Sequence, residues 1–82
     1  YEIYSLEVND EERKRIADRA FLWFLKAAEQ GMCYSQRRVG DFYFNGAGCE
    51  KDISKAYIWH KKAAMQGNEY SKEWLRKNGY VL

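Results

Sequence analysis

A twelve-residue segment occurs twice in this chain of 82 residues, and it constrains the fold more than any other feature. The first copy, AFLWFLKAAEQG, covers residues 20–31, and the second, AYIWHKKAAMQG, covers residues 56–67, an offset of 36 residues. The similarity continues beyond each final glycine, where Tyr34 matches Tyr70. A fixed period of about 20–50 residues is typical of stacked structural repeats, in which each unit packs on its neighbours.

Glycines and capping residues divide each repeat into two predicted helices. Glycine often follows a helix because it adopts the left-handed conformation at no steric cost, and a helical pattern ends at each of Gly31, Gly46, Gly67 and Gly79. Asn9 and Glu12 have the spacing of a capping box, and Asp52 and Asn68 are expected to cap later helices. We therefore expect helices over residues 10–30, 33–45, 53–66 and 69–78. Residues 1–8 fit either a short extended arm or the remnant of a preceding helix.

Small residues lie where neighbouring helices would meet, which favours close antiparallel packing. Such residues allow helix axes to approach to about 8–9 Å, and here they are Ser35, Ala56, Ala63 and Ala64. We expect Trp23, Trp59 and Tyr43 to fill the gaps between helix pairs. The predicted fold class is all-α, made of antiparallel helix-pair repeats: a fragment of an α/α solenoid with a right-handed superhelix.

Residues 35–67 carry a specific series of motifs at regular spacing. In chain order these are Ser35-Gln36, Val39-Gly40, the aromatic Tyr43, Gly46-Ala47-Gly48, Ala56, Trp59, and Ala63-Ala64 followed by Gly67. In residue type and order, this series resembles a Sel-one-like repeat, a relative of the tetratricopeptide repeat. The resemblance implies a single domain over residues 1–82, with one complete repeat at about 32–67 flanked by half repeats.

The last half repeat departs from the pattern of that family. Arg76 stands where the pattern has glycine, at the position equivalent to Gly40. A large side chain there works against close packing of a further helix. We therefore expect this end to act as a cap or a natural terminus of the array.

Charge and hydropathy exclude two classes of partner. The chain has 14 basic and 12 acidic side chains, which give a formal net charge of +2, and the two signs are interleaved. Nucleic-acid binding usually requires a basic stripe, so we expect no nucleic-acid partner. A transmembrane helix needs about 18 or more consecutive apolar residues, and the sequence has no such run. The chain opens on Tyr1, which fits a processed product or a piece of a longer protein. Cytoplasm and bacterial periplasm both remain open.

No pattern of residues indicates a cofactor, a metal or a catalytic site. The loop NGAGCEKD at residues 45–52 lacks the preceding strand and third glycine of a dinucleotide-binding loop. His60 is the only histidine, and Ala63 and Ala64 occupy the positions where a second metal ligand would stand. We expect His60 to belong to the edge of the core.

The two cysteines, Cys33 and Cys49, lie at opposite ends of one predicted helix. That helix would separate them by about 20 Å, whereas a disulfide needs Cα atoms within about 7 Å. We therefore expect two free thiols, with Cys49 packing in its loop as a small apolar residue. Some cysteine-rich members of the resembled family are cell-envelope hydrolases, but the regular cysteine spacing of those proteins is missing here.

The remaining candidate for function is the surface formed by the first helix of each pair, which lines the concave side of such solenoids. The positions opposite the core, including Phe44, place aromatic residues beside arginines, a combination enriched in interface hot spots. The expected partner-binding residues are Tyr34, Arg37, Arg38, Asp41, Asn45, Tyr70, Glu73, Trp74 and Lys77. The alternative is that Arg37 and Arg38 are merely solvated and that Trp74 packs on the adjacent helix.

The resemblance implies a non-catalytic protein–protein interaction module of the adaptor, regulator or toxin-immunity type. Its partner would be a protein bound on the concave helical surface. Two alternatives remain, a cell-envelope hydrolase of the cysteine-rich kind and a structural piece of a longer solenoid. With so few repeats, self-association through open helix faces is a further way to complete the surface.

Overall fold

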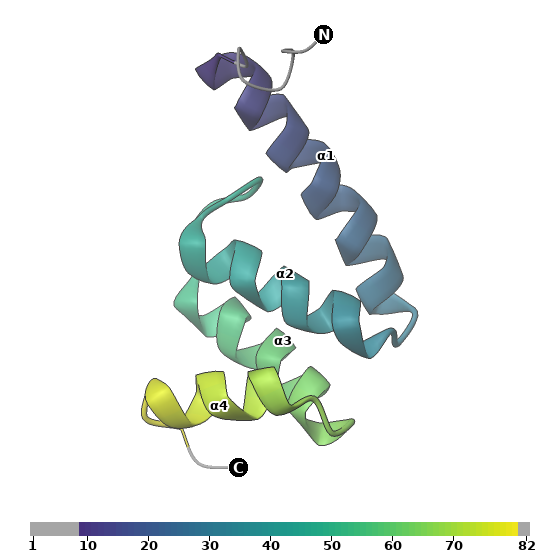
Figure 1. Cartoon of the computed structure of the whole chain (residues 1–82), viewed down its shortest axis with the longest axis vertical. Coiled ribbons are helices and arrows are strands. Elements are labelled where there is room, and N and C mark those ends of the chain that lie inside the picture. The colour runs from purple at the N-terminus through teal and green to yellow at the C-terminus, as the bar shows by residue number, and fades with distance from the viewer. Residues whose placement is uncertain (1–8, 81–82) are drawn as a thin grey trace, which may run out of the picture.

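The computed structural model describes residues 9–80, which form four α-helices and no strand (Figure 1). The helices are α1 (Asp10–Glu29), α2 (Cys33–Asn45), α3 (Ile53–Met65) and α4 (Glu69–Lys77). Each predicted helix is confirmed to within one residue at both ends, so the all-α prediction is correct. The segment 1–8, with its two alternative interpretations, lies outside the described residues.

The helix ends follow from local chemistry. The Asn9 side chain accepts a hydrogen bond from the Glu12 backbone N–H at 2.8 Å, and Glu12 Oε1 accepts one in return from the Asn9 N–H. Asp52 caps α3 and Asn68 caps α4 in the same way, by accepting from backbone N–H groups three residues later. All three predicted caps are confirmed. They satisfy amide donors that the first turn of a helix would otherwise leave unpaired.

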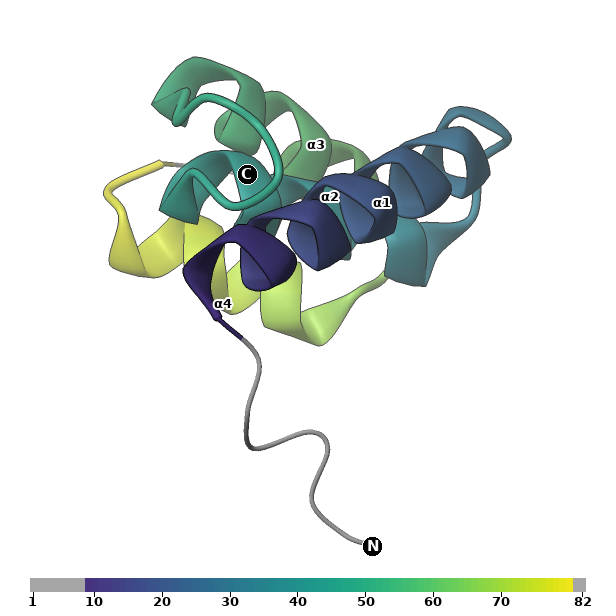
Figure 2. The ribbon, with the colours of Figure 1, turned by 90° about the horizontal axis from the view of Figure 1, so that it is seen from above.

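The helices pack in sequence order. α2 contacts both α1 and α3, and α4 contacts α3. Figure 1 shows this order along the longest axis of the molecule, and Figure 2 shows α3 and α4 on opposite sides of the stack. As a result, α2 and α4 meet through their side chains rather than through close backbone packing, which leaves a surface shared by these two helices.

The core has two parts, one on each side of α2 and α3. The first contains Phe21, Ala28 and Val39, with Trp59 packed against it. The second contains Ala56, Ala64, Trp74 and Leu75. Tyr43 packs against both. The expected positions of Trp59 and Tyr43 between helix pairs are therefore confirmed.

The same expectation for Trp23 is wrong, because its side chain is 73% exposed. Trp23 is the counterpart of Trp59, which is covered because α3 packs beside α2 and the first core. No described helix packs against the outer side of α1. Trp23 therefore lacks the neighbouring helix that covers Trp59. Sequence equivalence therefore predicts burial only where the neighbouring unit is also present.

The glycine-containing loop between α2 and α3 presses against α1. Gly48 has φ +72°, and a Cβ atom there would lie 2.4 Å from the Ala17 carbonyl oxygen and 2.8 Å from Phe21 Cβ. Only glycine fits so close an approach. Cys49, the next residue, packs against the first core as a partly buried apolar side chain. The loop thus joins α1 to the α2–α3 pair, as expected for a structural turn.

The α2–α3 contact should be sensitive to added volume. Ala63 has no exposed surface, and its carbonyl oxygen lies 3.5 Å from Cys33 Sγ at the start of α2. Ala63→Leu should lower the free energy of unfolding by about 1–3 kcal/mol through overpacking, measured by urea denaturation. The control Met65→Leu, at a side chain that is 76% exposed, should change it by less than about 0.5 kcal/mol. Equal stability of the two variants would contradict close packing at Ala63.

Candidate protein-binding surface

The expected partner-binding residues lie together on the side of the molecule shared by α2 and α4. Tyr34 and Tyr70 are each about half exposed, Asn45 and Lys77 are exposed, and Arg37, Arg38, Asp41 and Glu73 are partly buried. Between the two helices is a shallow hollow of about 330 Å³. Its walls come from α2 and α4 and from the residue after α4: Phe44, Tyr70, Glu73, Trp74, Lys77 and Asn78. The structure therefore brings four of the expected residues, Tyr70, Glu73, Trp74 and Lys77, together around one hollow.

Next to the hollow, arginine and aromatic side chains alternate across three helices. The Arg37 guanidinium carbon lies 3.9 Å from the centre of the Tyr70 ring and 5.4 Å from that of Tyr34. The guanidinium carbon of Arg38 lies 4.9 Å from the Phe24 ring centre. Cation–aromatic contacts at these distances are attractive. We call these five residues, Phe24, Tyr34, Arg37, Arg38 and Tyr70, the arginine–aromatic band.

Tyr34 and Arg38 are joined directly within the band. Arg38 Nη1 donates a hydrogen bond to the Tyr34 hydroxyl at 2.9 Å. This hydrogen bond and the adjacent positive charge hold the pKa of Tyr34 below its ordinary value. The two arginines are thus neither free in solvent nor part of the core. Their orientations are set by aromatic rings on α1, α2 and α4. They are therefore not merely solvated, which was the alternative to partner binding that the sequence left open.

Trp74 is the exception among the expected partner-binding residues, because it is only 7% exposed. Its ring stacks on His60, with ring centres 4.3 Å apart, and meets the Phe44 ring edge-on at 5.3 Å. Trp74 therefore packs on the adjacent helix, as the alternative interpretation proposed, and forms the floor of the hollow. Its indole Nε1 is buried and makes no hydrogen bond within the described part of the chain.

A buried polar chain beneath this surface ties three helices together. His60 on α3 has no exposed surface. Its Nδ1 lies 2.9 Å from Ser71 Oγ on α4, and its Nε2 lies 3.1 Å from Asp41 Oδ1 on α2. Both ring nitrogens are therefore hydrogen-bonded, as buried polar groups require. The sequence indicated that His60 belongs to the edge of the core, and the structure places it deeper.

The Ser71–His60–Asp41 chain has the residue types of a hydrolase triad but not the access that catalysis requires. A nucleophilic serine must reach a substrate carbonyl, yet Ser71 has no exposed surface. Its oxygen faces the imidazole from inside the α3–α4 contact. We therefore interpret the chain as a clamp that fixes helix positions, and we name it the histidine clamp.

Sequence reasoning missed the histidine clamp because its members come from three helices. The one available signal was Gly40, adjacent to Asp41. A Cβ atom on Gly40 would lie 2.5 Å from His60 Cδ2, so the glycine makes room for the ring. A lone histidine on an apolar face, opposite a glycine followed by aspartate, is the pattern that could have revealed it.

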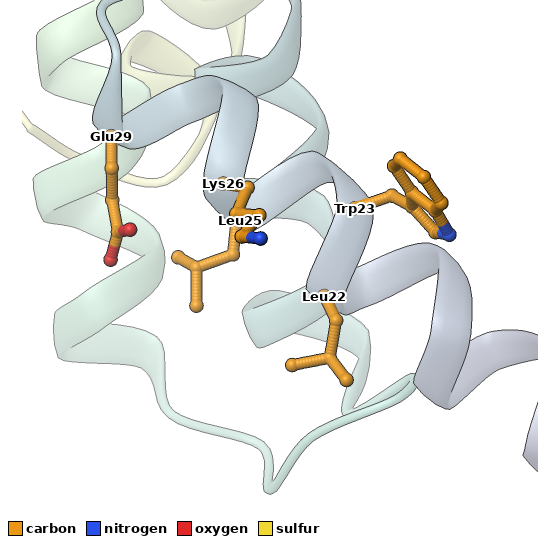
Figure 3. A pocket seen from close by; sticks show the side chains of 5 residues that line it. All are labelled: Leu22, Trp23, Leu25, Lys26 and Glu29. Carbon is orange, nitrogen blue, oxygen red and sulfur yellow. The ribbon is translucent and has the colours of Figure 1, made fainter.

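A second exposed surface lies on the outer side of α1 (Figure 3). Ile16 and Leu22 are each 60% exposed, and Leu22, Trp23 and Leu25 line a shallow, mainly apolar hollow together with Lys26 and Glu29. Figure 3 shows Leu22, Leu25 and Glu29 pointing to one side of the helix, while Trp23 extends in a different direction. This surface was not among the predicted partner-binding residues.

Both cysteines are free thiols, and Cys49 is shielded from solvent more than an open loop would allow. Burial raises the pKa of the Cys49 thiol, with a smaller opposing effect of the Lys55 charge. Residues 9–80 contain no group of three or more His, Cys, Asp or Glu side chains that could hold a metal ion. Over the same residues, no helix is both long enough and apolar enough to cross a membrane.

The histidine clamp can be tested by removing its serine hydroxyl. Ser71→Ala leaves one nitrogen of the buried His60 ring without a partner, so the free energy of unfolding should fall by about 1–3 kcal/mol. The control is Ser54→Ala on the exposed side of α3, which should change it by less than about 0.5 kcal/mol. Urea denaturation followed by circular dichroism measures both. The clamp would be refuted if Ser71→Ala were as stable as the control.

The shielding of Cys49 should appear in its reactivity. In a Cys33→Ser variant, which leaves Cys49 as the single thiol, alkylation by iodoacetamide should be slower in the native protein than in urea. Because only the thiolate reacts and the native pKa is raised, the native rate should rise with pH at a higher midpoint than the unfolded rate. Identical pH profiles in the two states would show that Cys49 is not packed as described.

Comparison with known proteins agrees with this architecture. The Sel1 repeat profile matches residues 17–32 and 33–68. A crystal structure of a Sel1 repeat protein from Oxalobacter formigenes is 41% identical and superposes with a TM-score of 0.73 over 74% of this chain, which spans 18% of that protein. Curated proteins give no match. Sel1 repeat proteins are generally protein-interaction modules and typically non-catalytic. With its repeats in register and its four helices stacked in order, this chain belongs to the Sel1 repeat family.

Proposed function

We propose that this chain is a non-catalytic module that binds a protein partner through the surface shared by α2 and α4. The observation that carries the proposal is the position of Arg37, whose guanidinium lies over the Tyr70 ring at 3.9 Å and so links α2 to α4 beside the hollow. Tyrosine and arginine supply much of the energy at protein interfaces. Because contacts within the molecule already order these side chains, binding should cost less conformational entropy.

The hydrolase alternative has less support. Both cysteines are free, whereas the hydrolases considered in the sequence analysis are cysteine-rich. The one serine that meets the histidine is fully buried. The proposal does not choose among adaptor, regulator and toxin-immunity roles, because these differ in the identity of the partner rather than in the chemistry of the surface.

A structural role within a longer solenoid is the second candidate, and the exposed apolar side of α1 favours it. Trp23 is exposed at the position where its counterpart on α3, Trp59, is covered by the rest of the stack, and Leu22 beside it is also exposed. A neighbouring helix, from the same chain or from a second copy, would remove this apolar surface from water. In that case the main contact would be at α1 rather than at the α2–α4 surface.

Affinity capture from the native host with three forms of the chain separates the two candidates. Arg37→Glu/Arg38→Glu reverses both charges of the arginine–aromatic band, and Leu22→Glu/Trp23→Glu alters only the outer side of α1. Trp74 is left intact because it belongs to the core. We expect the band variant to lose the partners that the unmodified chain recovers, and the α1 variant to keep them. Thermal unfolding by circular dichroism confirms that each variant is folded.

The reverse pattern, with partners lost only in the α1 variant, would support the structural candidate instead. Recovery of the same partners by all three forms would contradict both assignments.

A further inference from the structure

The carboxylates beside the α2–α4 hollow are already paired, while two of the basic groups there are not. Asp41 accepts from His60, and Glu73 forms an ion pair with Arg76 one turn along α4. Within residues 9–80, Arg38 and Lys77 have no carboxylate partner. The surface therefore carries a local excess of positive charge, although the chain as a whole is close to neutral.

Arg37 retains hydrogen-bonding capacity despite its contacts. Its Nε is buried and lies 3.9 Å from Asp41 Oδ2, which is too long for a hydrogen bond, so the outer Nη groups are the donors left for a partner. A ring beside a guanidinium occupies its face, and the N–H donors lie in its plane. Since the Arg37 side chain is only 22% exposed, an ion pair formed there would be screened less by water than one at an open surface.

The hollow adds an apolar site next to these charges. Tyr70 belongs both to the arginine–aromatic band and to the wall of the hollow, so the two are contiguous. Phe44 and Trp74 provide an aromatic floor and wall. Lys77 lies on the same hollow. A segment that binds here would meet basic groups on α2, then an apolar depression, then a further basic group on α4.

We propose that the partner docks an acidic peptide segment, with one apolar side chain in the hollow and flanking carboxylates on Arg37, Arg38 and Lys77. This inference rests on the proposed function and specifies the chemistry of the partner. Arginine binds carboxylates through paired N–H donors. A nucleic acid fits less well, because binding to phosphates needs a longer basic track than these three side chains provide.

Nuclear magnetic resonance titration of the ¹⁵N-labelled chain tests this. The probe is acetyl-Glu-Glu-Leu-Glu-Glu-amide, and its isosteric control replaces each Glu by Gln. We expect the acidic peptide to shift the backbone resonances of α2 and α4 and the Nε–Hε resonances of Arg37 and Arg38. The Gln peptide should bind about tenfold more weakly, because it cannot form charge-assisted hydrogen bonds. Raising the salt concentration should weaken the binding of the acidic peptide and leave the binding of the Gln peptide unchanged.

Matched variants locate the interaction. Arg37→Gln/Arg38→Gln should weaken the acidic peptide about tenfold, whereas Arg15→Gln/Arg19→Gln removes two exposed charges from α1 and should leave binding unchanged. The variants keep long polar side chains, and their spectra without peptide verify the fold. Equal weakening by both pairs would show a general charge effect and overturn the inference.

The remaining outcomes are also decisive. No shift with the acidic peptide at millimolar concentration, or equal shifts with both peptides, would overturn the acidic class. Stronger shifts of the same resonances with single-stranded oligothymidine would identify a nucleic acid instead, and shifts that depend on protein concentration alone would identify a second copy. If partners are captured only when the arginine–aromatic band is intact, but still bind after their own carboxylates are neutralised, the proposed function stands and this inference fails.

Discussion

The arrangement of α2, α3 and α4 depends on one buried imidazole. His60 has no exposed surface and is hydrogen-bonded through both nitrogens, to Asp41 on α2 and Ser71 on α4. Its ring fits because Gly40 has no side chain, since a Cβ atom there would lie 2.5 Å from His60 Cδ2. Apolar contacts tolerate small shifts, but a buried polar group loses much of its benefit when a partner moves away. The clamp therefore fixes the relative positions of three helices.

The proposed binding surface is built directly on this clamp. Asp41 accepts from His60 and also lies beside Arg37, whose guanidinium covers the Tyr70 ring. On the other side, the His60 ring stacks against Trp74, the floor of the hollow. The same histidine thus orients a partly buried acidic residue and the buried aromatic floor of the hollow. Sites supported by ordered core residues hold their geometry better than sites on free loops.

The helices and their ends could be predicted because their signals are local or repeated. Caps such as Asn68 act within three residues, and the 36-residue offset transfers information from one unit to the next. The prediction failed at Trp23, where the neighbouring unit that burial requires is not among the described helices. It also missed the histidine clamp. His60 pairs with Ser71, 11 positions away, and with Asp41, 19 positions away, and these contacts depend on the angle at which the helices cross. Sequence spacing alone does not provide that angle.

The two repeats share a backbone plan but differ in the residues that matter for recognition. The position of His60 is taken by Phe24 in the earlier unit, and that of Asp41 by Lys77 in the later one. Ser35, the counterpart of Ser71, is also buried. Because the phenylalanine ring cannot form a hydrogen bond with a serine hydroxyl as the imidazole does, an equivalent clamp cannot form there. Arg37, by contrast, contacts both Tyr34 and its repeat counterpart Tyr70. The repeat therefore supplies the matching tyrosines, and the difference between units determines where an ordered arginine can lie between them.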